Sequence, residues 1–178
     1  LSVNEINLNS NNSIFKDGIK HPQSKVYFYN DSKATQSIIQ AYILGPKQKS
    51  NYNKNLSLLF NSYFGSGMGS LMFQEIREFL SLAYRAYSSV ENPPIKLNDR
   101  AMRFNLLLST QADKTTDAIE AVESLLKNMP LSEIRLQAAK ENLINQAQSA
   151  YPNFRQKTQR IAQYIQEGYE EDPNKVLK

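Results

Sequence analysis

The decisive stretch of this chain covers residues 64–84 and reads FGSGMGSLMFQEIREFLSLAY. Its three glycines, Gly65, Gly67 and Gly69, are each separated by one residue and predict a turn, because glycine adopts backbone conformations that other residues avoid. Residues 70–80 then predict a short amphipathic helix, with Ser70 as its N-cap. The chain returns as a strand that begins near Tyr84, so a turn, a helix and a strand follow one another closely.

Arg77 on this helix and Tyr84 at the start of the strand are the best candidate functional residues. Arginine offers five rigid donors that suit carbonyl or carboxylate oxygens. The tyrosine hydroxyl can donate a hydrogen bond to an oxyanion as it develops. The alternatives are a surface salt bridge between Arg77 and a neighbouring glutamate, and a half-buried sheet position for Tyr84.

The glycine-rich turn does not fit a phosphate-binding loop. A Walker loop ends in Gly-Lys-Ser/Thr, and a dinucleotide-binding loop follows a strand. Here the glycines follow residues 51–63, whose apolar residues fall on one face of a predicted helix. We therefore interpret the turn as a connector between two helices.

Working outward, the remaining segments predict an α+β domain. Residues 1–24 lack hydrophobic periodicity and are interpreted as a linker or arm, followed by one domain over 25–178. Residues 36–44 predict a buried strand that stops at Gly45-Pro46, and residues 101–110 alternate as in a strand with one buried face. The element order ββααββααα favours a mostly antiparallel sheet with helices packed on one face. The predicted strands are 25–29, 36–44, 84–90 and 101–110, and the predicted helices are 51–63, 70–80, 114–129, 132–149 and 154–167, with Ser132 and Gly168 as cap residues.

Composition excludes several classes of site. The chain has 178 residues, a net charge of +4, no cysteine and a single histidine, His21. Cysteine chemistry and a zinc site with several histidine ligands within this chain are therefore excluded. Lysine and arginine are scattered, which argues against a nucleic-acid partner, and no apolar run reaches the ~18 residues of a membrane span. The chain begins at Leu1, which favours a piece cut from a longer protein, and the sequence assigns no compartment.

Residues 64–84 resemble a segment of the insulinase/pitrilysin-type zinc metallopeptidases, in which a Gly-rich turn precedes Leu-Phe-Gln-Glu-Ile-Arg-Glu and Leu-Ala-Tyr. Mitochondrial processing peptidases and core subunits of the respiratory cytochrome bc1 complex share this fold. The resemblance continues through the strand at 101–110 and covers about residues 25–178. Further matching segments are Asp113-Lys114-Thr115, Ser132-Glu133-Ile134 and Ala139-Lys140-Glu141.

The resemblance implies a division of labour between two homologous domains. One domain holds zinc on a His-x-x-Glu-His helix, and this chain lacks that motif. The chain therefore resembles the non-zinc, C-terminal-type domain that closes over the zinc-bearing domain and holds the peptide substrate in a chamber. By this resemblance Arg77 and Tyr84 contact the peptide backbone and help to polarise the scissile carbonyl, while the turn at Gly65, Gly67 and Gly69 helps to form the chamber wall.

On this interpretation zinc and the water that it activates belong to another domain of the same chain or to a partner subunit, and the isolated chain is inactive. The alternative is a non-catalytic structural or assembly domain, as in the respiratory-complex core subunits. The sequence departs from the family at Ser81, where glycine is frequent, and at the start of the helix, where the frequent arginine is missing. The family domain usually continues with another helix and strand, so we expect the fold to extend past residue 178.

Overall fold

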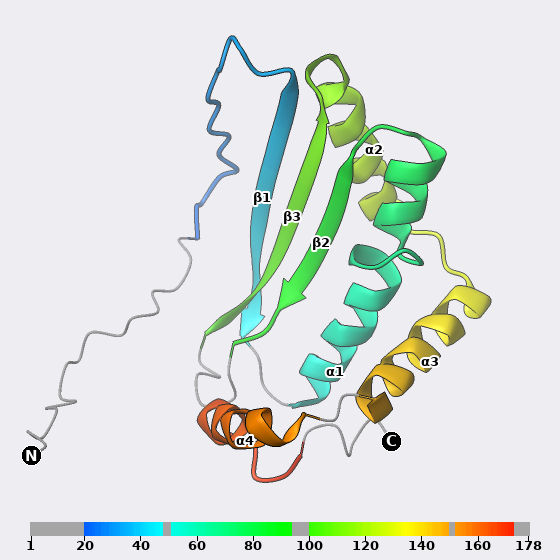
Figure 1. Ribbon diagram of the computed structural model, residues 1–178. Helices are drawn as coiled ribbons and strands as arrows, with labels where there is room; N and C mark the ends of the chain where they lie inside the picture. Colours follow the sequence, from blue (N-terminus) through cyan, green and yellow to red (C-terminus); the bar gives the residue numbers. More distant parts are fainter. Residues whose placement is uncertain (1–19, 48–50, 94–99, 150–151, 173–178) are drawn as a thin grey trace, which may run out of the picture.

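The fold is α+β, with a three-stranded antiparallel sheet and helices gathered on one side of it (Figure 1). A computed structural model describes residues 20–47, 51–93, 100–149 and 152–172. The elements in chain order are β1 (Gln36–Lys47), α1 (Asn51–Phe60), η1 (Asn61–Gly65), η2 (Met72–Phe79), β2 (Arg85–Glu91), β3 (Ala101–Gln111), η4 (Ala112–Lys114), α2 (Thr115–Lys127), α3 (Glu133–Ser149) and α4 (Phe154–Glu167).

β3 is the central strand, in the order β1-β3-β2. One row across the sheet joins Ile39, Leu108 and Ala86. Leu108 is fully buried, and Ile39 and Ala86 pack against the core from the two outer strands. Side chains alternate between the two faces of a strand, so the next row, with Ile38, belongs to the opposite face, where Ile38 is 71% exposed.

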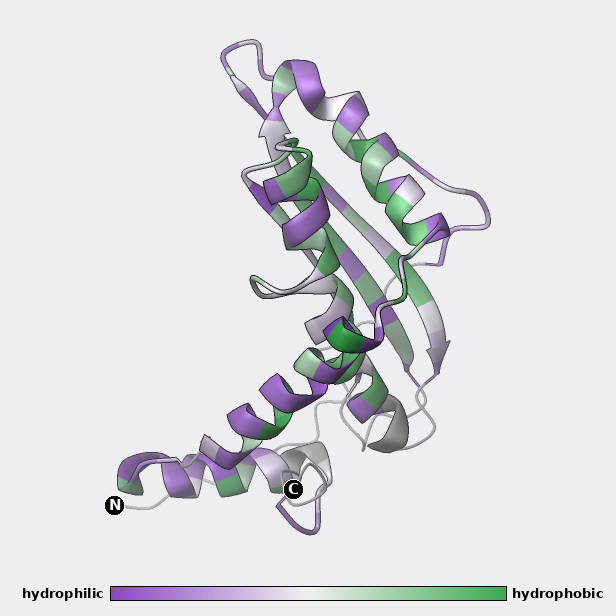
Figure 2. Cartoon of the chain, turned by 90° about the vertical axis from the view of Figure 1, so that its right-hand side faces the viewer, coloured by the Kyte–Doolittle hydropathy of each residue, from purple (hydrophilic) through white to green (hydrophobic). Residues whose placement is uncertain are grey.

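The core lies between the sheet and the helices (Figure 2). The residues on either side of the glycine-rich turn supply the largest buried side chains of the core, and α2 contributes Ala118 and Val122. Because these residues come from both η1 and η2, burial of apolar surface fixes the two short helices against β2 and β3. The buried side chains from this segment are Phe64, Leu71, Met72 and Ile76.

The predicted helix caps at Ser70 and Ser132 are confirmed. Ser70 Oγ accepts a hydrogen bond from the backbone N–H of Phe73, and Ser132 Oγ accepts one from the backbone N–H of Arg135, each at 3.3 Å. Gly168 ends α4 in the left-handed conformation with φ 96°. These caps satisfy backbone groups that have no partner within the helix.

One strand prediction is wrong, and a second strand is confirmed but differs from the prediction in its burial and its end. Residues 25–29 are not a strand: in the described part of the chain they pair with no other segment, and Val26 and Tyr29 are both 91% exposed. Strand-forming side chains stabilise a strand only against a partner, and none lies beside them here. The strand at 36–44 is an edge strand with mostly exposed side chains, and it continues past Gly45 and Pro46 to Lys47. An edge strand tolerates proline because the missing N–H need not bond to a neighbour.

The helix predicted over residues 51–63 also extends further than expected. It changes from α to π winding after Phe60 and ends at Gly65, so Gly65 is the last residue of the helix rather than a break in it. Residues 1–19 of the predicted arm lie outside the described residues. Within the described part of the chain, no helix is both long enough and apolar enough to cross a bilayer.

Candidate functional site

The three glycines of the turn differ in how strongly their surroundings require a glycine. At Gly65 an added Cβ would lie well inside 3.0 Å of the backbone carbonyl oxygen of Ser88 in β2, closer than real Cβ atoms approach. Gly67 has φ 91°, which favours glycine, and Gly69 has open space around it. Only Gly65 is therefore fixed by close packing against the sheet.

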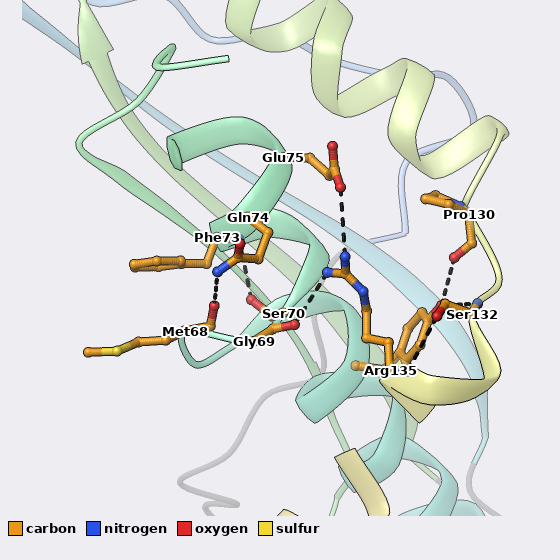
Figure 3. A network of polar contacts seen from close by, with 10 residues as sticks. Met68, Gly69, Ser70, Phe73, Gln74, Glu75, Pro130, Ser132 and Arg135 are labelled. Carbon is orange, nitrogen blue, oxygen red and sulfur yellow. Dashed lines mark hydrogen bonds and ion pairs between the residues drawn. The ribbon is translucent and has the colours of Figure 1, made fainter. Parts of the chain in front are cut away.

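The carbonyl groups of residues 67–69 in the turn each accept a hydrogen bond from a side chain. Ser70 Oγ donates to the Gly67 carbonyl at 2.8 Å, and Gln74 Nε2 donates to the Met68 carbonyl. Arg135 Nη1, from α3, donates to the Gly69 carbonyl at 3.4 Å (Figure 3). In the described part of the chain, no hydrogen bond uses the backbone N–H groups of residues 67–69. Among the described residues, the carbonyl groups of residues 67–69 thus have partners and their N–H groups have none.

Arg77 lies near the C-terminal end of η2 and is half-exposed. Its Nε lies 3.4 Å from Glu78 Oε1, and its guanidinium carbon lies 4.7 Å from the centroid of the Phe73 ring. The structure therefore contains the surface salt bridge with a neighbouring glutamate that the sequence allowed as an alternative. Surface pairs of this kind contribute at most about 1 kcal/mol, so a ligand can displace Glu78 at little cost.

Tyr84 comes directly before β2, at the end of the sheet where β3 finishes. Its backbone N–H donates to the Ser109 carbonyl at 2.7 Å, which extends the pairing of β2 with β3. Its hydroxyl accepts a hydrogen bond from Gln111 Nε2 at 3.1 Å, and the side chain is 53% exposed. Because the hydroxyl acts as an acceptor in this contact, its own hydrogen is available to a ligand.

No hydrogen bond or ion pair joins Arg77 to Tyr84; each side chain has its own partners. The backbone between them is nevertheless held in place. Leu82 N–H donates to the Ile76 carbonyl at 3.0 Å, and Thr110 Oγ1 donates to the Leu82 carbonyl. Ser81 has φ 51°, a left-handed conformation that costs a non-glycine residue about 1–2 kcal/mol. The connector therefore couples the end of η2 to the sheet.

Sequence reasoning missed three residues around this site. Arg135 lies on a helix far along the chain, Phe73 lies within the helix predicted over residues 70–80, and Gln111 lies one residue beyond the predicted strand at 101–110. The pairing of Gln111 with Tyr84 depends on the strand register, and the contact of Arg135 depends on how α3 packs. Neither leaves a periodic signal in the sequence.

The described residues of this chain do not fit a catalytic zinc ion. Such an ion takes histidine, carboxylate or cysteine ligands, with a minimum of three from the protein. The sequence has a single histidine, His21, and no cysteine. Among the described residues, no group of three or more His, Asp or Glu side chains is placed to hold a metal ion.

Comparison with known proteins gives one family and a set of structures. A sequence model described as the peptidase M16 inactive domain matches residues 4–143. A conserved protein from Enterococcus faecalis V583 superimposes with a TM-score of 0.63 at 19% identity, over 81% of this chain and 33% of that chain. A peptidase M16 inactive domain from Pseudomonas fluorescens does so with a TM-score of 0.54 at 20% identity, over 81% of this chain and 37% of that chain.

These structural similarities support the fold alone, because their sequence identities are low. The chain spans about a third of the length of each of these two structures. A search of curated proteins gave no match.

Proposed function

Because this chain belongs to the peptidase M16 inactive-domain family, we propose that it is the peptide-binding, non-catalytic domain of a zinc-dependent endopeptidase. Its resemblance to a non-zinc, C-terminal-type domain of the insulinase-type peptidases agrees with the family match. The proposed ligand is the backbone of a peptide or small protein that a homologous zinc-bearing domain would cleave in a closed chamber.

One observation carries the proposal: Arg77 and Tyr84 are both half-exposed donors, and the described part of the chain does not use all of their donor groups. Arg77 pairs with Glu78 through Nε, which leaves the two Nη groups for another acceptor. The Tyr84 hydroxyl accepts from Gln111 and keeps its hydrogen. A peptide carbonyl offers an acceptor of the required kind, and hydrogen bonds from a charged guanidinium are stronger than those between neutral groups.

The glycine-rich turn has a supporting part in this proposal. The carbonyl groups of residues 67–69 have side-chain partners, and within the described part of the chain the N–H groups of the same residues have none, so these N–H groups can meet a peptide carbonyl. The absence of side chains at Gly67 and Gly69 allows a ligand to approach the backbone closely. We therefore place the turn in the wall of the chamber, in contact with the backbone of the bound peptide.

The proposal is tested by kinetics on the longer protein that contains this chain, with fluorescein-labelled casein as the substrate. We expect Tyr84→Phe to lower kcat by about 10- to 100-fold, with a smaller change in KM, because the lost hydroxyl would donate mainly to the developing oxyanion. Tyr87→Phe is the matched control: Tyr87 is also partly exposed, at 43%, but alternates to the other face of the sheet.

An unchanged kcat for Tyr84→Phe would show that the hydroxyl is structural. The 178-residue chain alone should not cleave casein with added zinc, and zinc-dependent cleavage by it would contradict the proposal. Absence of His-x-x-Glu-His from both the longer protein and its partner subunits would instead favour the structural or assembly role.

A further inference from the structure

The start of α3 contacts the chain on both sides of the glycine-rich turn, which lies between η1 and η2. Two side chains make these contacts, Tyr63 from η1 and Arg135 from α3 (Figure 3 shows the Arg135 contacts). Neither has a place in the proposed peptide contacts. Their arrangement therefore calls for its own explanation.

Tyr63 fixes the beginning of α3 against η1. Its side chain is buried, its hydroxyl donates to the Pro130 carbonyl at 2.7 Å, and the same hydroxyl accepts from the Ser132 N–H at 2.9 Å. One hydroxyl thus satisfies a backbone acceptor and a backbone donor at the turn into α3. The base of α3 is held in place before the helix reaches Arg135.

Arg135 then reaches the other side of the turn. Its Nη1 donates to the Gly69 carbonyl at 3.4 Å, and its Nη2 lies 3.9 Å from Glu75 Oε1 in the first half of η2. Both charged side chains are about one-third exposed, at 31% and 35%. An arginine suits this position because its planar guanidinium can meet two acceptors at once, whereas a lysine amine acts as a single point of charge.

Residues 67–69 of the turn need such support because packing does not supply it. No atom lies within 4 Å of a Cβ built at either Gly67 or Gly69. The core residues Phe64 and Leu71 anchor the flanking helices, and residues 67–69 between them are exposed. Without the contact from α3, residues 67–69 would be held only by local hydrogen bonds with Ser70 and Gln74.

We propose that Arg135 is a positioning residue that clamps the glycine-rich turn and the start of η2 to α3, and so sets the direction in which Arg77 is presented to a peptide. The peptide part of this inference rests on the proposed function. The clamp itself rests on the contacts of Arg135 with Gly69 and Glu75 and can be tested separately.

The first test measures amide hydrogen exchange in the 178-residue chain. We expect Arg135→Gln to speed exchange about three- to tenfold at Phe73 and Gln74, whose N–H groups bond to the Ser70 hydroxyl and carbonyl. The amide of Ser66, on the η1 side, should keep its rate, because it bonds to the Asn61 carbonyl. Lys140→Gln removes one exposed charge from the same helix and is the matched control.

Arg135→Lys should give an intermediate exchange rate, because lysine can keep one of the two contacts. Unchanged exchange at Phe73 and Gln74 in Arg135→Gln would overturn the clamp. Faster exchange throughout the chain would also overturn it, since the loss would then be a general destabilisation rather than a release of the turn.

The second test uses the longer protein with fluorescein-labelled casein. If Arg135 acts through Arg77, Arg135→Gln should lower kcat/KM about tenfold, and the double variant with Arg77→Gln should be no worse than Arg77→Gln alone. Losses that multiply would overturn the positioning role. If Arg77→Gln alone leaves kcat/KM unchanged, the proposed function fails and the positioning role in peptide binding fails with it, while the exchange data still decide the clamp.

Discussion

Replacement of Gly65 by alanine gives the sharpest test of how the turn meets the sheet. Gly65 is buried as the last residue of η1, and its Cα faces β2. An added Cβ would lie 2.6 Å from Ser88 Oγ and closer still to the Ser88 backbone carbonyl oxygen. The nearest neighbour is backbone, which cannot rotate away as the end of a flexible side chain can. The substitution therefore forces η1 and β2 apart.

The expected change in the free energy of unfolding of Gly65→Ala follows from two opposing effects. Overpacking of this kind costs about 3 kcal/mol when the backbone must move. Alanine in a helix regains about 1 kcal/mol relative to glycine. The net destabilisation of about 2 kcal/mol corresponds to a Tm lower by about 4–8 °C for a chain of this size.

Thermal unfolding followed by circular dichroism measures this change. Gly69→Ala is the matched control, because nothing lies within 4 Å of its Cβ, and its Tm should change by no more than the equivalent of about 0.5 kcal/mol. A second substitution, Ser88→Gly, should not rescue Gly65→Ala, because the closest clash is with the backbone of residue 88. Equal Tm values for Gly65→Ala and Gly69→Ala would refute the reasoning.

Three further predictions concern other parts of the chain. Ser81→Gly should raise the free energy of unfolding by about 0.5–1 kcal/mol in a urea titration, because φ 51° suits glycine; a decrease would contradict this. Tyr63→Phe should lower it by about 1–3 kcal/mol through the loss of two hydrogen bonds, and a change near zero would count against the anchoring of α3. The hydrogen bond from Lys127, followed by its charge, lowers the pKa of Glu123 below 4.5. The Glu123–Lys127 pair therefore stabilises the fold at a pH above the ordinary pKa of Glu123. This stabilisation is lost as the pH falls through the pKa of Glu123 in the folded state. Lys127→Met should raise the Glu123 pKa in an NMR titration; an unchanged pKa would exclude this cause.

Local features of the fold could be predicted from the sequence where one residue or one period determines them. The alternation around Leu106 and Leu108 identified β3, and the capping roles of Ser70 and Ser132 follow from their side chains. The two candidate site residues, Arg77 and Tyr84, are both exposed enough to meet a ligand. Their proposed roles came from the resemblance to a family and not from periodicity.

Other features depend on contacts between distant segments and could not be predicted. Residues 25–29 have strand-forming side chains but no partner strand in the described part of the chain. The π winding of η2 depends on which carbonyl each N–H reaches: Leu80 bonds to the Glu75 carbonyl, one residue further back than in an α-helix. The link from Arg135 to Gly69 arises only once α3 has packed beside the turn.

The central position of β3 has a consequence for synthesis. Within the described residues β1 and β2 both pair with β3 and not with each other. During translation the sheet therefore cannot begin to form until the residues from Ala101 onward leave the ribosome, after both outer strands have already emerged. Until then the backbone groups of two strands are open to pairing with other chains. We expect a nascent chain that stalls between Glu91 and Ala101 to depend most strongly on chaperones.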